Sequence, residues 1–220
     1  MPDLVIFDCD GVLIDSEVIA ARILAECLCD AGFPATAAEA MTLGFGSNRA
    51  TLTAAIEVRF GRTLPEDFFD VMRAASAVAF DTELRAMPGI AELLAALPGP
   101  RCVASNSHTT RIRHALGVTG LLRWFDPHVY SAAEVPRGKP APDLFLYAAA
   151  RMGADPARTL VIEDSPTGVE AALAAGMAVV GFAGGSHCAD DHDAMLLAGG
   201  CARVFPDMAE LAAFLRAGAG

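Results

Sequence analysis

The sequence lacks the clusters of positive charge typical of proteins that bind nucleic acids or membranes. Its 220 residues carry a net charge of −11 and contain no cluster of lysine and arginine, so neither nucleic acid nor an anionic membrane surface is an expected partner. No basic region precedes an apolar one at the N-terminus, where the first charge is Asp3, so no signal peptide is expected. The apolar run at residues 171–185 is too short to span a bilayer.

Cysteine spacing also excludes a common class of site. The chain has six cysteines, and they show none of the paired Cys-x-x-Cys spacing typical of zinc sites. Cys9 and Cys102 lie in apolar stretches, where buried reduced thiols are common. Together with the lack of a leader, this predicts a soluble cytoplasmic protein with reduced thiols.

The chain does contain short apolar runs that alternate with helical patterns, as is typical of a parallel α/β sheet. Its 54% of hydrophobic residues are enough for one sizeable core with an inserted piece. Strands are predicted at residues 3–7, 101–105, 128–131, 159–163, 178–182 and 203–205. Helices are predicted between them at residues 89–97, 109–116, 142–151, 166–175 and 207–217.

Residues 16–87 interrupt this rhythm, because they show helical patterns and no convincing strand. Ser16 is expected to cap a helix that ends near Gly32. Further helices are expected at residues 36–43, 48–60 and 65–84. The sequence therefore predicts a core made of residues 1–15 and 88–220, with a helical insertion at 16–87.

Two carboxylates, Asp8 and Asp10, follow the first predicted strand in the stretch DCDG. At positions i and i+2 of extended backbone they point to the same side, and charges this close need a cation or a shared proton. Gly11 lets the backbone turn and approach a ligand. Alone, this pattern also fits a solvated turn. A calcium loop does not fit, because its glycine comes sixth rather than fourth.

Polar groups also follow the second strand. Ser105, Asn106 and Ser107 stand just before a predicted helix, where hydroxyl, amide and helix N–H groups favour a bound anion. Further along, Lys139 precedes Pro140, which holds it in extended backbone. One such ammonium can neutralise a phosphate or a carboxylate. A helix cap and a surface turn are the alternatives for these two segments.

Glu163 and Asp164 end a further apolar strand. A hard cation such as Mg²⁺ prefers one or two carboxylates, with water and substrate phosphate completing its shell. Asp164, or Glu163 beside it, is therefore expected to form a cation site with Asp8 and the backbone carbonyl of Asp10. Four strand ends with these groups in this order indicate a single site.

With these segments in place, the chain resembles the haloacid dehalogenase-like hydrolases of the subgroup with a helical cap after the first strand. The matching stretches are DCDGVLIDSE, SNS, GKPAPD and EDSPTG. The resemblance implies an α/β fold with a Rossmann-like parallel sheet core and an inserted α-helical cap. It also implies a Mg²⁺-dependent reaction in which Asp8 is the nucleophile and Asp10 the general acid and base.

The same resemblance assigns the remaining site residues. Ser105 and Asn106 match the segment that orients phosphate, with Gly11 also close to it, and Lys139 matches the lysine that stabilises the transferring group. Asp164, with Glu163, matches the magnesium-binding acids. The resemblance implies a small phosphorylated metabolite as substrate: a sugar, sugar-acid or polyol phosphate, or one like phosphoglycolate.

Arg49 lies in the inserted segment and is a candidate for binding a second polar or anionic group of the substrate. An exposed arginine at a helix start fits the same position. A cap of about seventy residues over the Asp8 site favours small substrates over macromolecules, because a lid excludes bulky ligands. The oligomeric state is left open, and a monomer is compatible with the sequence.

Three other activities fit parts of this pattern. A non-enzymatic phosphoacceptor switch has its acid pair first and its phosphorylated Asp later, which is the reverse of the order here. Dehalogenases of this superfamily lack the second acid, so Asp10 favours phosphate esters. A sugar phosphomutase of the β-phosphoglucomutase type shares every core residue named above. Such enzymes carry a histidine early in the first cap helix, whereas the corresponding stretch of this chain has Ala20 and Ala21. The mutase is the alternative retained.

One stretch with possible ligands, SHCADDHD at residues 186–193, is left without a role. A second metal site is conceivable there, but the stretch is predicted to be a loop and its spacing fits no familiar ligand set. His187 is expected near the mouth of the active site.

Overall fold

The protein is built on one sheet of six parallel strands. The computed structural model describes residues 2–217, and the strand order is β3-β2-β1-β4-β5-β6. The strands are β1 (Leu4–Phe7), β2 (Arg101–Ser105), β3 (Val129–Ser131), β4 (Thr159–Glu163), β5 (Ala178–Phe182) and β6 (Val204–Phe205). All six predicted strands are therefore present, and three begin one residue later than expected. The predicted Rossmann-like α/β fold is confirmed.

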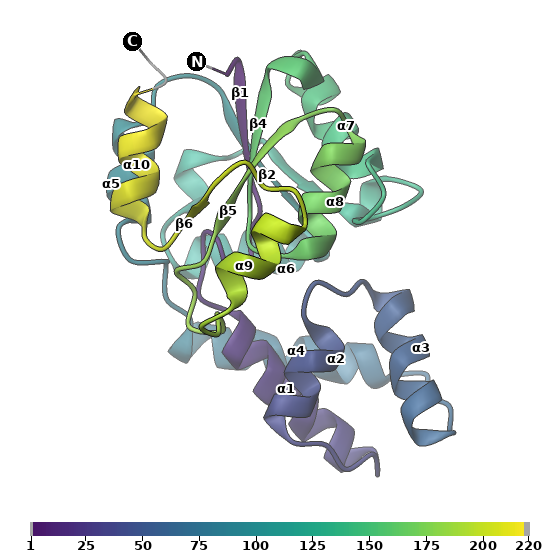
Figure 1. The fold of residues 1–220 in the computed structure, drawn as a ribbon. Helices are drawn as coiled ribbons and strands as arrows, with labels where there is room; N and C mark the ends of the chain where they lie inside the picture. The colour runs from purple at the N-terminus through teal and green to yellow at the C-terminus, as the bar shows by residue number, and fades with distance from the viewer. Residues whose placement is uncertain (1, 218–220) are drawn as a thin grey trace.

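Helices cover both faces of this sheet (Figure 1). One face, with Val5 and Phe7 of β1, packs against α5 (Ile90–Ala96), α6 (Thr109–Val118) and α10 (Met208–Ala217). The other, with Leu4 and Ile6, packs against α7 (Asp143–Arg151), α8 (Pro166–Ala174) and α9 (His192–Ala198). Burial on both sides explains why β1 and β4 are nearly continuous apolar runs.

The ends of these helices agree only partly with the sequence prediction. Ser165 caps α8 by accepting a hydrogen bond from the Gly168 amide at 3.1 Å, and Pro166 is the first helical residue. Helix α9 is missing from the prediction, which left residues 186–193 as a loop. Three single-turn helices were also not predicted, at residues 122–124, 132–134 and 156–158.

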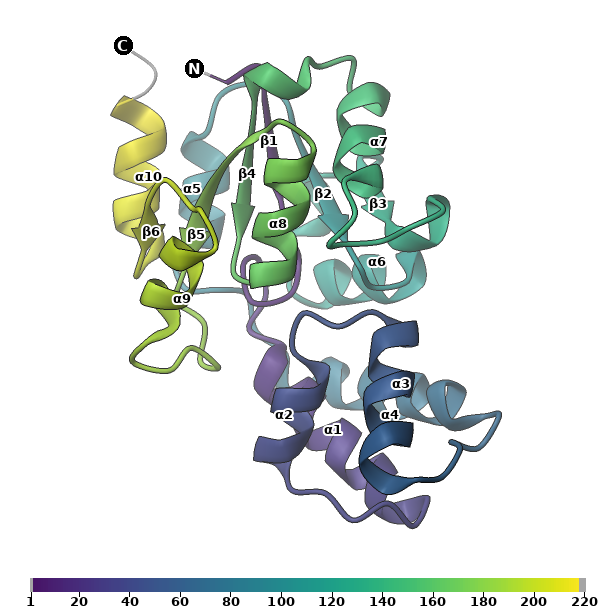
Figure 2. The same cartoon turned by 45° about the vertical axis from the view of Figure 1, so that its right-hand side comes forward.

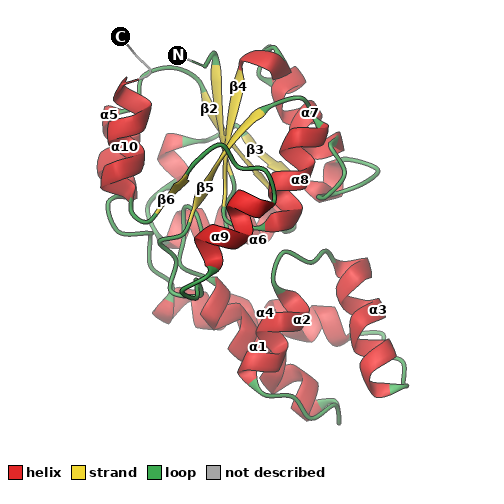
Figure 3. Ribbon diagram, in the orientation of Figure 1, coloured by secondary structure: helices red, strands yellow, loops and turns green. Residues whose placement is uncertain are grey.

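The inserted segment consists of helices joined by loops, as Figure 3 shows by colour. Its helices are α1 (Glu17–Asp30), α2 (Ala37–Gly44), α3 (Arg49–Phe60) and α4 (Phe68–Glu83). They bury an apolar cluster of their own that includes Leu28, Phe33 and Ile56. The prediction that Ser16 caps α1 is wrong: its hydroxyl makes no capping bond and instead donates to Asp10 Oδ1 at 2.6 Å.

Two antiparallel chain segments connect the insertion to the core. The Met87 amide donates to the Leu13 carbonyl at 2.9 Å, and the Asp15 amide donates to the Arg85 carbonyl at 3.0 Å. These connections leave the core at the carboxyl ends of the strands, so the four helices lie against that edge of the sheet (Figure 2). Among the described helices, none combines the length and hydropathy needed to cross a membrane.

Candidate active site

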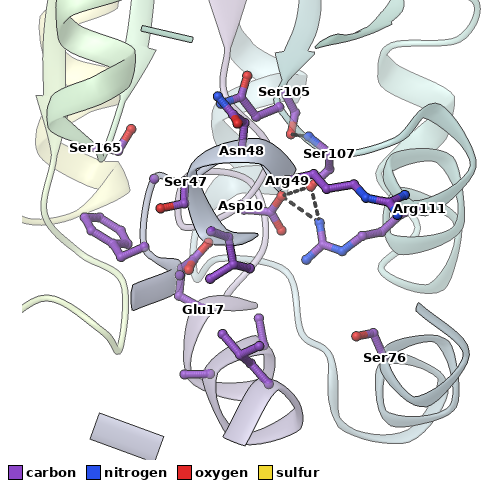
Figure 4. A pocket seen from close by; sticks show the side chains of 18 of the residues that line it. Asp10, Glu17, Ser47, Asn48, Arg49, Ser76, Ser105, Ser107, Arg111 and Ser165 are labelled. Atoms are coloured by element: carbon purple, nitrogen blue, oxygen red, sulfur yellow. Dashed lines mark hydrogen bonds and ion pairs between the residues drawn. The ribbon is translucent and has the colours of Figure 1, made fainter. Parts of the chain in front are cut away.

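The candidate site lies where the strand order reverses, with β2 on one side of β1 and β4 on the other. Such a switch point opens a crevice at the carboxyl ends of parallel strands. Asp8 and Asp10 follow β1, Ser105 ends β2 and Glu163 ends β4. A cavity of about 600 Å³ opens there between core and insertion, and polar side chains from both line it (Figure 4).

Lys139 lies between two carboxylates at the base of this cavity. Its ammonium donates to Asp8 Oδ1 and to Glu163 Oε1, the latter at 2.6 Å, and only 3% of its side chain is exposed. It is also the sole lysine of the chain. Burial lowers the pKa of Lys139, but the two carboxylates outweigh burial and raise it, so the ammonium stays charged.

For the Asp8 carboxyl, burial outweighs the charge of its partner Lys139. Burial raises its pKa well above the ordinary range, and the nearby carboxylates of Glu163 and Asp164 raise it further, while Lys139 lowers it. The nearby negative charges are therefore only partly offset by one ammonium. This part of the site still lacks positive charge, which is the condition under which carboxylates bind a cation.

Glu163 uses its whole carboxylate to hold its neighbours in place. Besides the contact with Lys139, its Oε2 accepts hydrogen bonds from the Asp164 amide, the Ser165 amide and the Ser165 hydroxyl, each at 3.0 Å. Gly168 leaves room for it, because a Cβ there would lie 1.9 Å from the carboxylate. Glu163 is fully buried and positions the turn that carries Asp164.

Asp164, in contrast, leaves one oxygen without a donor. Its Oδ2 is buried and accepts no hydrogen bond from any described residue. His187 Nε2 lies 3.1 Å away, but not in hydrogen-bonding geometry. Burial, followed by Glu163, raises the pKa of Asp164 well above its usual value. The Asp164 carboxylate can lie close to the backbone at Gly11 only because a glycine stands there: a Cβ would lie 1.8 Å from Oδ2. Oxygens of Asp8, Glu163 and Asp164 lie within 4.8 Å of one another, a donor set that fits a hard cation.

Asp10 has a separate set of partners. Ser16 donates to its Oδ1 at 2.6 Å, and Ser107 and Arg111 donate to its Oδ2 at 3.0 and 2.7 Å, as Figure 4 shows for the last two. Burial raises the pKa of Asp10, but the charge and hydrogen bonds of Arg111 outweigh burial and hold that pKa below its ordinary value. Asp8 and Asp10 are therefore shifted in opposite directions.

Arg111 is the main functional candidate that the sequence analysis missed. It lies in the first turn of α6, and its guanidinium donates to the hydroxyl of Ser107, just before the helix, at 2.7 Å. Its other side packs against Phe80 of α4, 4.9 Å from the ring centroid. Its place in the predicted helix just after the SNS stretch was the only signal available in the sequence.

Ser105 and Asn106, at the end of β2 and just after it, have different roles. Ser105 Oγ accepts from the Ser107 amide at 3.1 Å, which leaves the Ser105 O–H group able to donate to a ligand. Asn106 pairs with the backbone of Lys139 instead: its Oδ1 accepts from the Lys139 amide at 2.9 Å and its Nδ2 donates to the Lys139 carbonyl at 3.2 Å. Asn106 therefore positions Lys139.

The insertion contributes the opposite wall of the cavity. Arg49 lines it with its guanidinium 4.5 Å from the centroid of the Phe69 ring, and it forms no ion pair within residues 2–217. Glu17 also lines the cavity (Figure 4). Burial, followed by the charges of Asp10 and Asp164, raises the pKa of Glu17 to about 8. Ala20 stands on the same wall.

Known proteins match this chain over most of its length. The model of the haloacid dehalogenase-like hydrolases, a hydrolase family, matches residues 2–176. A 6-phosphogluconate phosphatase from Escherichia coli (strain K12) is 32% identical over 87% of this chain and 85% of its own. A phosphorylated carbohydrates phosphatase from Thermotoga maritima is 31% identical over 93% and 95%. A solved HAD-family hydrolase from Deinococcus radiodurans R1, with bound phosphate and sodium, is 37% identical over 98% and 96%, with a TM-score of 0.78.

Proposed function

Because the chain belongs to the haloacid dehalogenase-like hydrolase family, we propose that it is a Mg²⁺-dependent phosphomonoester hydrolase that acts through an aspartyl-phosphate. Its relatives of similar length are phosphatases of phosphorylated carbohydrates and of 6-phosphogluconate. The chain is accordingly a phosphatase of phosphorylated metabolites. A sugar, sugar-acid or polyol phosphate, or a phosphoglycolate-like compound, is the proposed substrate class.

Asp8 is the proposed nucleophile, and Asp10 the proposed acid and base. A carboxylate oxygen of Asp8 attacks phosphorus, the bond from phosphorus to the ester oxygen breaks, and Asp10 gives its proton to that oxygen. Water then attacks the aspartyl-phosphate, Asp10 takes a proton from it, and inorganic phosphate leaves with Asp8 restored. The ammonium of Lys139, already bonded to Asp8, and the Ser105 hydroxyl stabilise the oxygens of the transferring group.

Asp8 and Asp164 are the proposed ligands of Mg²⁺, with the backbone carbonyl of Asp10. The single observation that carries this assignment is the Asp164 Oδ2 atom, which is buried and has no donor in the described part of the chain. Glu163 is the poorer candidate, because its carboxylate already accepts four hydrogen bonds. When bound, the ion neutralises charge on the nucleophile and on the phosphoryl oxygens.

Residues 16–87 are proposed to act as a cap, with residues 1–15 and 88–220 as the catalytic core. Cap residues line the cavity opposite Asp8, which suits a lid that excludes water and bulky substrates. Arg49 has no carboxylate partner among the described side chains, so its charge is available to a second anionic or polar group of the substrate. A sugar-acid phosphate offers such a group.

The mutase alternative is weaker. Sugar phosphomutases of the β-phosphoglucomutase type carry a histidine where this chain has Ala20, whose methyl group lines the cavity and cannot transfer a proton. Solved structures described as putative β-phosphoglucomutases include one from Thermotoga maritima at 24% identity, a likeness that concerns the fold alone. Cytoplasmic location stays a prediction from the sequence.

The test is a phosphate-release assay over a panel of esters: sugar, sugar-acid and polyol phosphates, phosphoglycolate, p-nitrophenyl phosphate and a phosphopeptide. Activity is expected to disappear in EDTA and to return with Mg²⁺, and Asp8→Asn should abolish it. Full activity in EDTA, or a phosphopeptide as the best substrate by kcat/KM, would contradict the proposal. Interconversion of sugar phosphates without phosphate release would establish the mutase instead.

Arg49 is tested on the best substrate of that panel. Arg49→Ala is expected to raise KM on this substrate far more than on p-nitrophenyl phosphate, which has no second anionic group for Arg49 to bind. Arg59→Ala, in the same helix and paired with Glu39, is the control. Equal increases in KM on both substrates would remove Arg49 from the substrate site.

A further inference from the structure

A cluster of side chains of the kinds that bind metals lies beside Asp164 and outside the catalytic steps described above. It consists of His187 and Cys188, in the loop after β5, and His192 at the start of α9. One ligand atom from each lies within 4.8 Å of the other two. We propose that His187, Cys188 and His192 form a second metal site, selective for thiophilic ions such as Zn²⁺, whose occupation inhibits the phosphatase.

The distances around His187 fit a tetrahedral ion. His187 Nε2 lies 3.5 Å from Cys188 Sγ and 3.1 Å from Asp164 Oδ2. Tetrahedral zinc with ordinary bond lengths places a nitrogen and a sulfur ligand about 3.6 Å apart, and a nitrogen and an oxygen ligand about 3.3 Å apart. Asp164 Oδ2, the buried oxygen without a donor in residues 2–217, is the proposed fourth ligand because it lies this close to His187.

His192 is already oriented for this role by a hydrogen bond from its other nitrogen. Its Nε2 lies 2.7 Å from the Asp164 carbonyl, and since a carbonyl only accepts, Nε2 must carry the hydrogen. The lone pair then belongs to Nδ1, the atom left for a metal. Histidine ligands in metal sites commonly donate their second N–H to a carbonyl or carboxylate in this way, which fixes the tautomer and the ring.

The two imidazoles of the cluster are largely shielded from water, whereas Cys188 is half-buried. Only 2% of the His187 side chain is exposed, and Phe45 of the cap packs against both imidazoles, with ring centroids 5.1 Å from His187 and 5.7 Å from His192. Two imidazoles, one thiol and one carboxylate are a zinc-type donor set, whereas Mg²⁺ takes oxygen ligands. On binding, the Cys188 thiol forms a bond to the ion and releases its proton to solvent.

Inhibition follows from the shared carboxylate, and this part rests on the proposed function. Asp164 Oδ2 cannot serve the catalytic Mg²⁺ while it is bound to an ion held by His187 and Cys188. Zinc inhibition should therefore depend on Cys188, although Cys188 has no part in the chemistry at Asp8. Metal binding itself requires only the cluster and is measurable without a substrate.

The test replaces zinc by Co²⁺, whose absorption reports its ligands. The full-length protein, freed of metal and kept reduced, is titrated with Co²⁺ up to a few equivalents. A thiolate-to-cobalt charge-transfer band is expected in the wild type and in Cys29→Ser, the control for the other cysteine that is not buried. The band should be absent in Cys188→Ser, and Zn²⁺ should abolish it in the wild type. No band in the wild type would overturn the proposed site, whatever the variants do.

The second arm measures phosphatase activity at a fixed Mg²⁺ concentration while Zn²⁺ is increased. Cys188→Ser is expected to need about tenfold more Zn²⁺, or more, for half inhibition, since loss of even an outer partner costs 10–100-fold in metal affinity. Equal inhibition of wild type and variant would show that zinc acts only at the Mg²⁺ site and would overturn the regulatory role. If no phosphate ester is hydrolysed, the proposed function fails while the cobalt spectrum still decides the site.

Discussion

Lys139→Met is expected to destabilise the metal-free protein strongly, because it removes the only ammonium between Asp8 and Glu163. Methionine keeps most of the side-chain volume, so the change is mainly one of charge. The buried carboxylates of Asp8 and Glu163 then lose their direct counterion, and Asp164 loses a nearby positive charge. Breaking a buried ion pair from one side typically costs about 3–5 kcal/mol.

The cost should appear in thermal unfolding without metal at neutral pH. For a chain of this size, 1 kcal/mol corresponds to a shift in Tm of about 2–4 °C, so a fall of roughly 6–20 °C is expected. Arg137→Met is the matched control: Arg137 pairs with Asp143 at 2.8 Å, but its side chain is 70% exposed. Surface pairs contribute about 0–1 kcal/mol, so this variant should melt close to wild type.

If the fall in Tm of Lys139→Met has an electrostatic cause, two conditions should reduce it. Acid protonates the carboxylates, so the difference from wild type should shrink as the pH falls. Saturating Mg²⁺ replaces the missing charge, and at 100 times its Kd a ligand adds about 2.7 kcal/mol. A variant that melts within about 2 °C of wild type in EDTA, or whose deficit is independent of both pH and Mg²⁺, would refute this account of the site.

Two further predictions concern the remaining carboxyl groups of the cavity. Asp10→Asn is expected to lower kcat on alkyl phosphates by about 10²–10⁴-fold, and much less on p-nitrophenyl phosphate, whose leaving group needs no proton; equal losses would contradict the acid role. Glu17 has a pKa of about 8 in the folded protein against an ordinary 4.5, so the folded state binds the extra proton between these values. The free energy of unfolding should fall as pH rises through that window, by at most about 1.4 kcal/mol per pH unit from this group. In Glu17→Gln this contribution should be absent, and unfolding profiles of the same slope in both proteins would argue against the raised pKa of Glu17.

The strands and the position of the site were predictable because they depend on properties that the sequence displays directly. Strands buried on both faces, such as β1 and β4, are continuous apolar runs bounded by polar residues. Parallel strands end at the same edge of a sheet, so polar groups that follow Phe7 and Ser105 must approach one another. No knowledge of the packing is needed for either inference.

What the sequence did not predict depends on tertiary packing. Ser16 follows a local rule in isolation and should cap α1, but the nearby Asp10 carboxylate is the stronger acceptor. Arg111 reaches Asp10 only because α6 packs with one particular face toward the site. Helix α9 is only 7 residues long, too short to be stable by itself, and packing of Leu196 into the core stabilises it. That helix brings His192 to His187, a contact that the spacing in the sequence did not predict.

The opposite pKa shifts of Asp8 and Asp10 suggest why catalysis would require both cation and substrate. Without ligands, burial favours the protonated form of Asp8, while Arg111 favours the ionised form of Asp10. Nucleophilic attack requires an ionised Asp8, and proton donation requires a protonated Asp10. A cation beside Asp164 lowers the pKa of Asp8, and a phosphate dianion beside Asp10 raises the pKa of that acid. On the proposed mechanism, the cation therefore favours the ionised nucleophile, and the substrate favours the protonated acid.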